Sequence, residues 1–295
     1  MTVAPEQDRA VAGADSDAVL FSFADPAAEL YGLARLGLSG EGEDRRGSAL
    51  AVLFQGRQPG TAIAEGDIAV DPAADWSALS LPGLGASVDA PLERWSVLMR
   101  SERHGFALTF EATSPPAELA EDEPAARAGG MAGYEQLCRV RGEISIDGEV
   151  HAVEDGIGQR GHTWGSPDWR RLEAAHTLCA WMGHEDGIAV TTLHSAGDAG
   201  HGDDARWGAL LGPEGPTPIE DPRVSTTFDG AGRQRRAGLE LWIGADEGEY
   251  ARRAAGTVLC GSTLELGQLR LDCAFMRWTM GGQVGIGRYD VLRRP

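Results

Sequence analysis

Hydrophobic and polar residues alternate in short runs along most of the chain, and the runs end at Gly, Pro or Asp. In one such run Phe106, Leu108 and Phe110 fall on one face, while Thr109 and Glu111 fall on the other. This period of two is typical of strands with one buried face, and helical spacing is hard to find. The runs predict strands over residues 17–23, 48–55, 60–71, 93–100, 105–113, 134–146, 172–182, 187–195, 205–211, 236–243, 256–264, 269–280 and 284–292.

About fourteen strands are too many for one small barrel and fit two antiparallel sheets or barrels. An acidic, Pro-rich segment over 114–130 is expected to be a solvated loop with at most one helical turn. A Gly-rich stretch in mid-chain is the natural junction between the two units. The expected division is a disordered tail over 1–16, an N-terminal unit over 17–165 and a C-terminal unit over 166–295.

The net charge restricts the partners of the chain. With 295 residues and a formal charge of −19, its surface repels nucleic acid phosphates and anionic lipids. No apolar run approaches the ~20 residues that span a bilayer, and the N-terminus has no apolar core of a signal peptide. We therefore expect a cytoplasmic protein that binds no nucleic acid, does not insert into membranes and is a monomer or homodimer.

The residue types present exclude several kinds of chemistry. The sequence has no Lys, which excludes a Schiff base, a pyridoxal phosphate enzyme and a P-loop. The four cysteines are far apart without a CxxC pair and are expected to be buried and inert. A Gly-rich loop carries His194, Asp198, His201, Asp203 and Asp204, but their spacing matches no metal site, so we expect no metal.

The stretch from Gly156 to Trp169 combines glycines with Arg160, His162 and Trp164, and its composition indicates a tight corner. It contains a formal GxGxxG. A dinucleotide site requires that motif to open a helix, whereas Pro167 and a run of non-helical residues follow here. We reject a dinucleotide site and expect no cofactor.

The same stretch, Gly-x-Gly-x-Arg-x-His-Thr-Trp-Gly followed by Asp168-Trp169, resembles the hallmark of the carotenoid 1,2-hydratase (hydroxyneurosporene synthase) superfamily. That superfamily includes lipocalin-like Diels–Alderases and tocopherol-cyclase-like proteins. Shorter motifs agree with it in order along the chain: Phe21–Pro26, Pro91–Trp95, Tyr134–Gln136, Arg139–Gly142 and Gly282–Gly287.

The resemblance implies two tandem lipocalin-like antiparallel β-barrels that enclose or flank an apolar cavity. It also implies a cofactor-independent cyclase or isomerase, a pericyclase or a terpenoid-type cyclase, acting on an apolar polyene, polyketide or terpenoid in a bacterial secondary-metabolite pathway. A hydratase that adds water to an isoprenoid double bond is the enzymatic alternative. The alternative without catalysis is a lipocalin-type carrier of an apolar small molecule.

Candidate site residues follow from the hallmark and from strands that mix aromatic and polar side chains. Alternation places Arg160, His162 and Trp164 on one side of an extended segment, so they form either a proton-donating and anion-binding group or a scaffold between the barrels. The candidates for catalysis are His162, Arg160, Asp168 and Asp272. The candidates for substrate binding are Tyr134, Gln136, Trp164, Trp169, His176, Trp181, Trp242, Met276 and Trp278.

Two positions depart from the pattern of the resemblance. Gly161 stands where many relatives carry Asp before the His, so a carboxylate that could orient His162 is missing. Asp290 stands where relatives often end in a Glu-containing strand. Roles that depend on those acids do not transfer directly.

Overall fold

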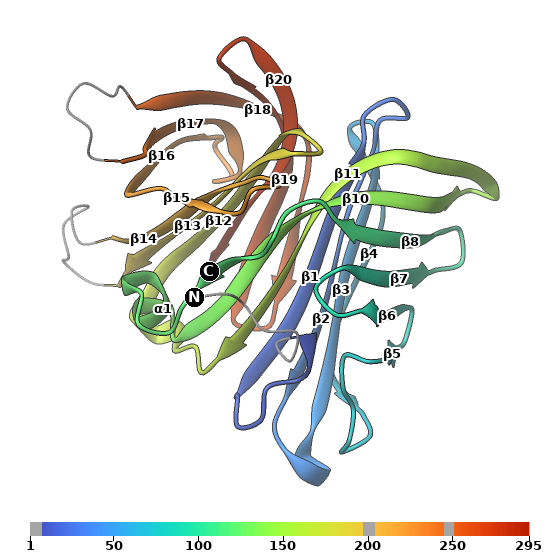
Figure 1. Cartoon of the computed structure of the whole chain (residues 1–295). Helices are drawn as coiled ribbons and strands as arrows, with labels where there is room; N and C mark the ends of the chain where they lie inside the picture. Colours follow the sequence, from blue (N-terminus) through green and yellow to red (C-terminus); the bar gives the residue numbers. More distant parts are fainter. Residues whose placement is uncertain (1–7, 197–203, 245–250, 295) are drawn as a thin grey trace.

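The computed structural model describes residues 8–196, 204–244 and 251–294. Its strands form two antiparallel sheets, one after the other along the chain (Figure 1). The first sheet contains β1 (Ser16–Asp25), β2 (Leu30–Ser39), β3 (Arg46–Gln55), β4 (Gln58–Ala69), β5 (Leu79–Leu81), β6 (Leu84–Ala90), β7 (Arg94–Arg100), β8 (His104–Ala112), β9 (Ala117–Leu119), β10 (Met131–Ile146) and β11 (Glu149–Gly165). The second contains β12 (Leu172–Gly183), β13 (Asp186–Ser195), β14 (Ala205–Leu211), β15 (Thr217–Pro218), β16 (Asp221–Phe228), β17 (Gln234–Trp242), β18 (Arg252–Leu266), β19 (Leu269–Met280) and β20 (Gln283–Arg293).

Both sheets share one topology. The strand orders are β4-β3-β2-β1-β11-β10-β8-β7-β6-β5, with β9 beside β10, and β15-β14-β13-β12-β20-β19-β18-β17-β16. In each sheet the first strand pairs with the second and with the last, so β1 lies beside β11 and β12 beside β20. This is how a meander curls back on itself to form a barrel. The prediction of two tandem lipocalin-like β-barrel units is confirmed.

The buried apolar side chains of the described residues form three clusters, one inside each barrel and one between the barrels. One fills the first barrel and includes Phe21, Phe23 and Trp95, and another fills the second barrel around Trp278. The third lies between the barrels, where Tyr31 of β2 packs against Phe275 of β19 with ring centroids 5.6 Å apart. The facing strands therefore bury both of their faces, one in a barrel and one in the interface.

The Gly-rich hallmark is a strand and not the predicted corner. It forms most of β11, which pairs with β1 on one side and β10 on the other. Its glycines serve close packing, because a Cβ at Gly158 would come within 2.5 Å of the Ser22 carbonyl oxygen and 2.7 Å of Val140. The composition alone did not distinguish glycines that turn the chain from glycines that let strands pack closely.

The predicted acidic loop over 114–130 contains β9 and the short helix α1 (Pro124–Gly129). Pro124 occupies the start of the helix, and Gly130 ends it with a φ of 64°, a backbone conformation that glycine adopts without strain. Ala125 and Ala126 are buried, so the helix covers one end of the space between the barrels. The expected helical turn is present and the acidic residues 121–123 are exposed, but the residues that follow them are packed.

The described residues contain no helix long and apolar enough to cross a membrane. Cys138, Cys179, Cys260 and Cys273 are all buried and unpaired, as the sequence predicts. Burial raises the pKa of the Cys179 thiol to about 11, which keeps it protonated and unreactive at neutral pH.

Candidate active site between the barrels

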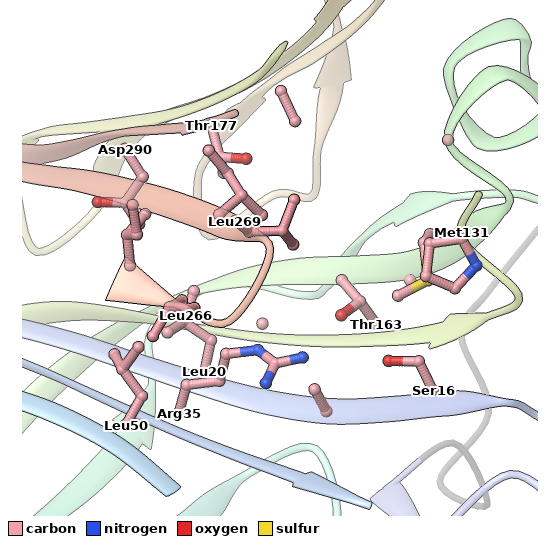
Figure 2. A pocket seen from close by; sticks show the side chains of 18 of the residues that line it. Ser16, Leu20, Arg35, Leu50, Met131, Thr163, Thr177, Leu266, Leu269 and Asp290 are labelled. Atoms are coloured by element: carbon pink, nitrogen blue, oxygen red, sulfur yellow. The ribbon is translucent and has the colours of Figure 1, made fainter. Parts of the chain in front are cut away.

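A cavity of about 720 Å³ borders the outer faces of both barrels (Figure 2). Strands β1 to β3 form its wall on the N-terminal side, and β12, β13 and β20 form much of the opposite wall. Its surface is mostly apolar, with Leu20, Leu50, Leu269 and Leu271 among the lining residues. A mostly apolar, pre-formed hollow with a few polar groups is what small-molecule sites have in common.

Glu135 of β10 is the acid that the first barrel contributes to the cavity. It points away from the barrel interior, because its neighbours Tyr134 and Gln136 occupy the other face of the strand. Gln159 donates from Nε2 to Glu135 Oε2 at 2.7 Å, and Trp181 donates from Nε1 to Gln159 Oε1 at 3.1 Å. Burial raises the pKa of the Glu135 carboxyl, while the Gln159 hydrogen bond and the Arg288 charge oppose that rise.

Gly161 lies directly opposite Glu135 in the register of β10 and β11. A Cβ at Gly161 would sit 2.7 Å from Glu135 Oε1, so the missing side chain is what makes room for the carboxylate. Position 161 and His162 point to opposite faces of β11, and a carboxylate at 161 could not have oriented that imidazole. Where Gly161 replaces the Asp of many relatives, Glu135 on the neighbouring strand supplies an acid that faces the cavity.

The second barrel contributes an ion pair. Arg288 and Asp290 of β20 both line the cavity, with Arg288 Nη1 3.2 Å from Asp290 Oδ2. Among the described residues, Arg288 Nε and Asp290 Oδ1 are buried without a hydrogen-bond partner. Burial raises the pKa of the Asp290 carboxyl and the Arg288 charge opposes it. Glu135, Arg288 and Asp290 affect one another electrostatically across the interface.

The hallmark side chains face the interior of the first barrel. Arg160 Nη1 lies 2.9 Å from Asp8 Oδ1 and donates to the Tyr134 hydroxyl at 2.8 Å. His162 Nε2 lies 2.6 Å from Asp17 Oδ1, and its ring packs edge-on against Trp164. Tyr134 also borders the cavity, but its hydroxyl donates to Asp8 inside the barrel.

These contacts place the hallmark in a buried polar network of the barrel, which favours the scaffold interpretation. Gln136 belongs to the same interior face, where Nε2 donates to the carbonyl oxygens of Leu92 and Ser114. Arg160, His162, Trp164 and Gln136 do not line the cavity.

The two acids that the sequence nominated for catalysis are engaged elsewhere. Asp168 is outside the cavity lining, and its hydrogen bonds with Arg170 lower the pKa of its carboxyl. Asp272 is buried, where it accepts a hydrogen bond from Thr263 Oγ1 at 2.5 Å and pairs with Arg293 at 2.8 Å and with Arg270. A lowered pKa makes Asp168 a poor proton donor, and Asp272 does not line the cavity.

The remaining candidates divide between the cavity, its supports and the second barrel. Trp169 lines the cavity and Trp181 supports Glu135 through Gln159. Met276 and Trp278 are fully buried in the core of the second barrel, and Trp242 is 38% exposed. His176 lies outside the cavity, 2.8 Å from the Tyr289 hydroxyl, and burial lowers the pKa of its imidazole to about 4.

The loop that was considered for a metal is only partly described. Asp198, His201 and Asp203 lie outside the described residues, while His194 is 2.9 Å from Asp204. No group of three metal-ligating side chains occurs in the described part of the chain.

Sequence reasoning missed the cavity role of Glu135, Arg288 and Arg35. Arg35 and Arg288 are flanked by apolar or small residues, and Glu135 lies between the buried Tyr134 and Gln136, each in a strand that is largely buried. That pattern is the signal that could have found them, because a charge in such a strand must face a partner or a cavity.

Comparisons with known proteins agree with this fold. The family described as "Domain of unknown function (DUF7064)" matches residues 6–295. No curated protein sequence matches the chain.

Solved structures resemble the chain over nearly its whole length. A putative AttH from Nitrosomonas europaea has a TM-score of 0.71 at 14% identity, covering 99% of this chain and 97% of its own. CghA with Sch210972 has a TM-score of 0.66 at 13% identity, covering 95% of this chain and 89% of its own. Kievitone hydratase from Nectria haematococca has a TM-score of 0.66 at 9% identity, covering 99% and 93%. These neighbours establish the fold that the resemblance predicts.

Proposed function

The chain belongs to the family described as "Domain of unknown function (DUF7064)", and from the cavity between its barrels we propose that it is a cofactor-independent cyclase or isomerase. It protonates a carbon–carbon double bond of an apolar, unsaturated substrate of the polyene, polyketide or terpenoid type. The observation that carries this proposal is an apolar cavity lined by two carboxyl groups of raised pKa, Glu135 and Asp290, with the guanidinium of Arg288 paired to Asp290.

Charge balance assigns the proton. Asp290 is in direct ion-pair contact with Arg288, which favours its ionised form. Glu135 forms no ion pair with any described residue, and the Asp290 charge raises the pKa of its carboxyl further. Burial favours the protonated form of Glu135, so we assign it the role of general acid, since a carboxyl must be protonated to act as one.

The reaction follows from these roles. The Glu135 O–H bond breaks as a C–H bond forms on the alkene, and the alkene π electrons supply that bond. A second double bond of the substrate attacks the cation and closes a ring, and loss of a proton to a cavity carboxylate restores an alkene. Trp169 and Trp207 line the cavity, and an indole π face can stabilise the positive charge.

Hydration is the second candidate. Asp290 lines the cavity, and its carboxylate is the group that would accept a proton from a water that attacks the cation. A hydratase, kievitone hydratase, shares the fold, which supports this candidate at the level of fold.

Isotope labelling separates the possibilities. The protein is incubated with linear isoprenoid alcohols, and with a lipid extract of the producing cells, in D₂O and separately in H₂¹⁸O. A cyclase or isomerase gives a product that carries one deuterium on carbon and no ¹⁸O, whereas a hydratase gives a product that carries both labels in the respective solvents. Bound molecules that are recovered unlabelled and unchanged contradict the proposal and indicate a carrier.

Gln159→Leu is expected to move the alkaline limb of the pH–rate profile to higher pH. The Gln159 amide stabilises the ionised Glu135 carboxylate, so its removal raises the pKa of Glu135, and the acid form then persists to higher pH. The measurement is kcat against pH for the substrate found by labelling. Trp181→Phe keeps the Gln159–Glu135 hydrogen bond and should shift the limb less. An unmoved limb in Gln159→Leu would mean that another group supplies the proton.

A further inference from the structure

Arg35 is the only charged residue in β2, a strand buried almost throughout. The strand reads Leu-Tyr-Gly-Leu-Ala-Arg-Leu-Gly-Leu-Ser from Leu30 to Ser39, and its other residues are buried except the last. One face packs inside the first barrel and the other faces the second barrel. A guanidinium in such a strand is costly unless a partner compensates its charge.

The side chain of Arg35 points into the cavity. It pairs in register with Leu20 of β1 and Leu50 of β3, which line the same wall. Figure 2 shows its guanidinium projecting from that wall, with Asp290 on the opposite side of the hollow.

No described residue makes a hydrogen bond or ion pair with Arg35. Burial lowers the pKa of its guanidinium, and the nearby Asp17 charge, on the barrel side of β1, opposes that shift. Asp17 itself is engaged with His162 and Trp76. The other acids of the same cavity wall, Glu65 and Asp67, lie on β4, where Asp67 pairs with Arg46 at 3.3 Å.

We infer that Arg35 anchors a carboxylate head group of the substrate, whose apolar body extends through the cavity toward Glu135. A planar guanidinium with its donors unused matches a carboxylate with two hydrogen bonds, and the surrounding leucines exclude the water that would weaken them. The inference rests on the proposed function in taking this cavity as the substrate site, and it narrows the substrate to an amphiphilic unsaturated acid. With the head group fixed at Arg35, the length of the chain determines which double bond reaches the acid.

Binding of a saturated ligand tests the anchor without any reaction. Dodecanoate and dodecanol are titrated at neutral pH by calorimetry into the full chain and into Arg35→Gln. Charge-assisted hydrogen bonds predict that wild type binds dodecanoate about 10- to 100-fold more tightly than dodecanol, and that Arg35→Gln loses this preference while its affinity for dodecanol is unchanged. Arg94→Gln, which alters a half-exposed ion pair outside the cavity lining, should keep the preference.

Equal binding of the acid and the alcohol by wild type would overturn the inference, as would a preference that survives in Arg35→Gln or disappears only in Arg288→Gln. The melting temperature of ligand-free Arg35→Met provides a second readout. It should equal or exceed that of wild type, because an uncompensated buried charge is removed. A lower melting temperature would mean that Arg35 is a structural partner of Asp17. A carboxylate preference without labelled product would leave the anchor standing and contradict the catalytic proposal alone.

Discussion

Glu135→Gln is expected to lower kcat about 10²- to 10⁴-fold, the usual loss when a general acid is removed. Glutamine keeps the size of the side chain and can still bond to Gln159, but it has no proton acidic enough to transfer to an alkene. Substrate binding relies on the apolar walls, so KM should change little, and the loss should appear in kcat and kcat/KM alike. The measurement is steady-state turnover of the substrate identified by isotope labelling.

Asp168→Asn is the matched control, since it removes an acid that the sequence nominated but that lies outside the cavity lining. It should retain full activity. If Asp168→Asn were inactive and Glu135→Gln were active, the acid would lie at the end of the hallmark and the cavity between the barrels would not be the reaction site. A Glu135→Gln variant with lowered kcat and an unchanged melting temperature would separate catalysis from folding.

The alternation of residues predicted the β class and most strands correctly, but it failed where both faces of a strand are buried. β2 was not predicted, because Leu30 to Leu38 shows no alternation once its second face packs on the other barrel. β11 was interpreted as a corner, because glycines that serve close packing look the same in sequence as glycines that turn. Gly158 packs against Val140 within the first barrel, whereas the failure at β2 comes from the contact between the two barrels, which one barrel's pattern does not record.

The contact between the barrels also limited prediction of the site. Alternation on β10 correctly separated Tyr134 and Gln136 from Glu135, yet it could not say which face borders a cavity. The inward face was the natural choice for a single barrel, whereas the described cavity lies on the face that a lone barrel would expose to solvent. The sequence placed Trp169 and Trp181 among the candidates because large aromatic side chains near the junction are expected to pack in the interface between the barrels, and both lie there.

Asp8→Asn is expected to destabilise the protein by about 3–5 kcal/mol, the usual effect of removing one partner of a buried ion pair. The composition predicts a disordered tail over 1–16, of which residues 1–7 lie outside the described residues. The tail expectation does not hold for Asp8, which is only 2% exposed and faces Arg160 at 2.9 Å inside the first barrel. Its carboxylate also accepts hydrogen bonds from Tyr134 and from Trp95 Nε1.

Without that carboxylate the Arg160 guanidinium is buried without a compensating charge. This raises the free energy of the folded state relative to the unfolded state, in which water solvates the charge. Urea unfolding followed by tryptophan fluorescence measures the loss, since Trp95 lies beside the pair. Asp15→Asn, at an exposed acid of the same segment, is the control and should change little. The double variant Asp8→Asn/Arg160→Met should recover part of the stability, because it removes the unpaired charge as well. Equal unfolding of Asp8→Asn and Asp15→Asn would instead mean that the segment before β1 is a dispensable tail and that Arg160 is held by Tyr134 alone.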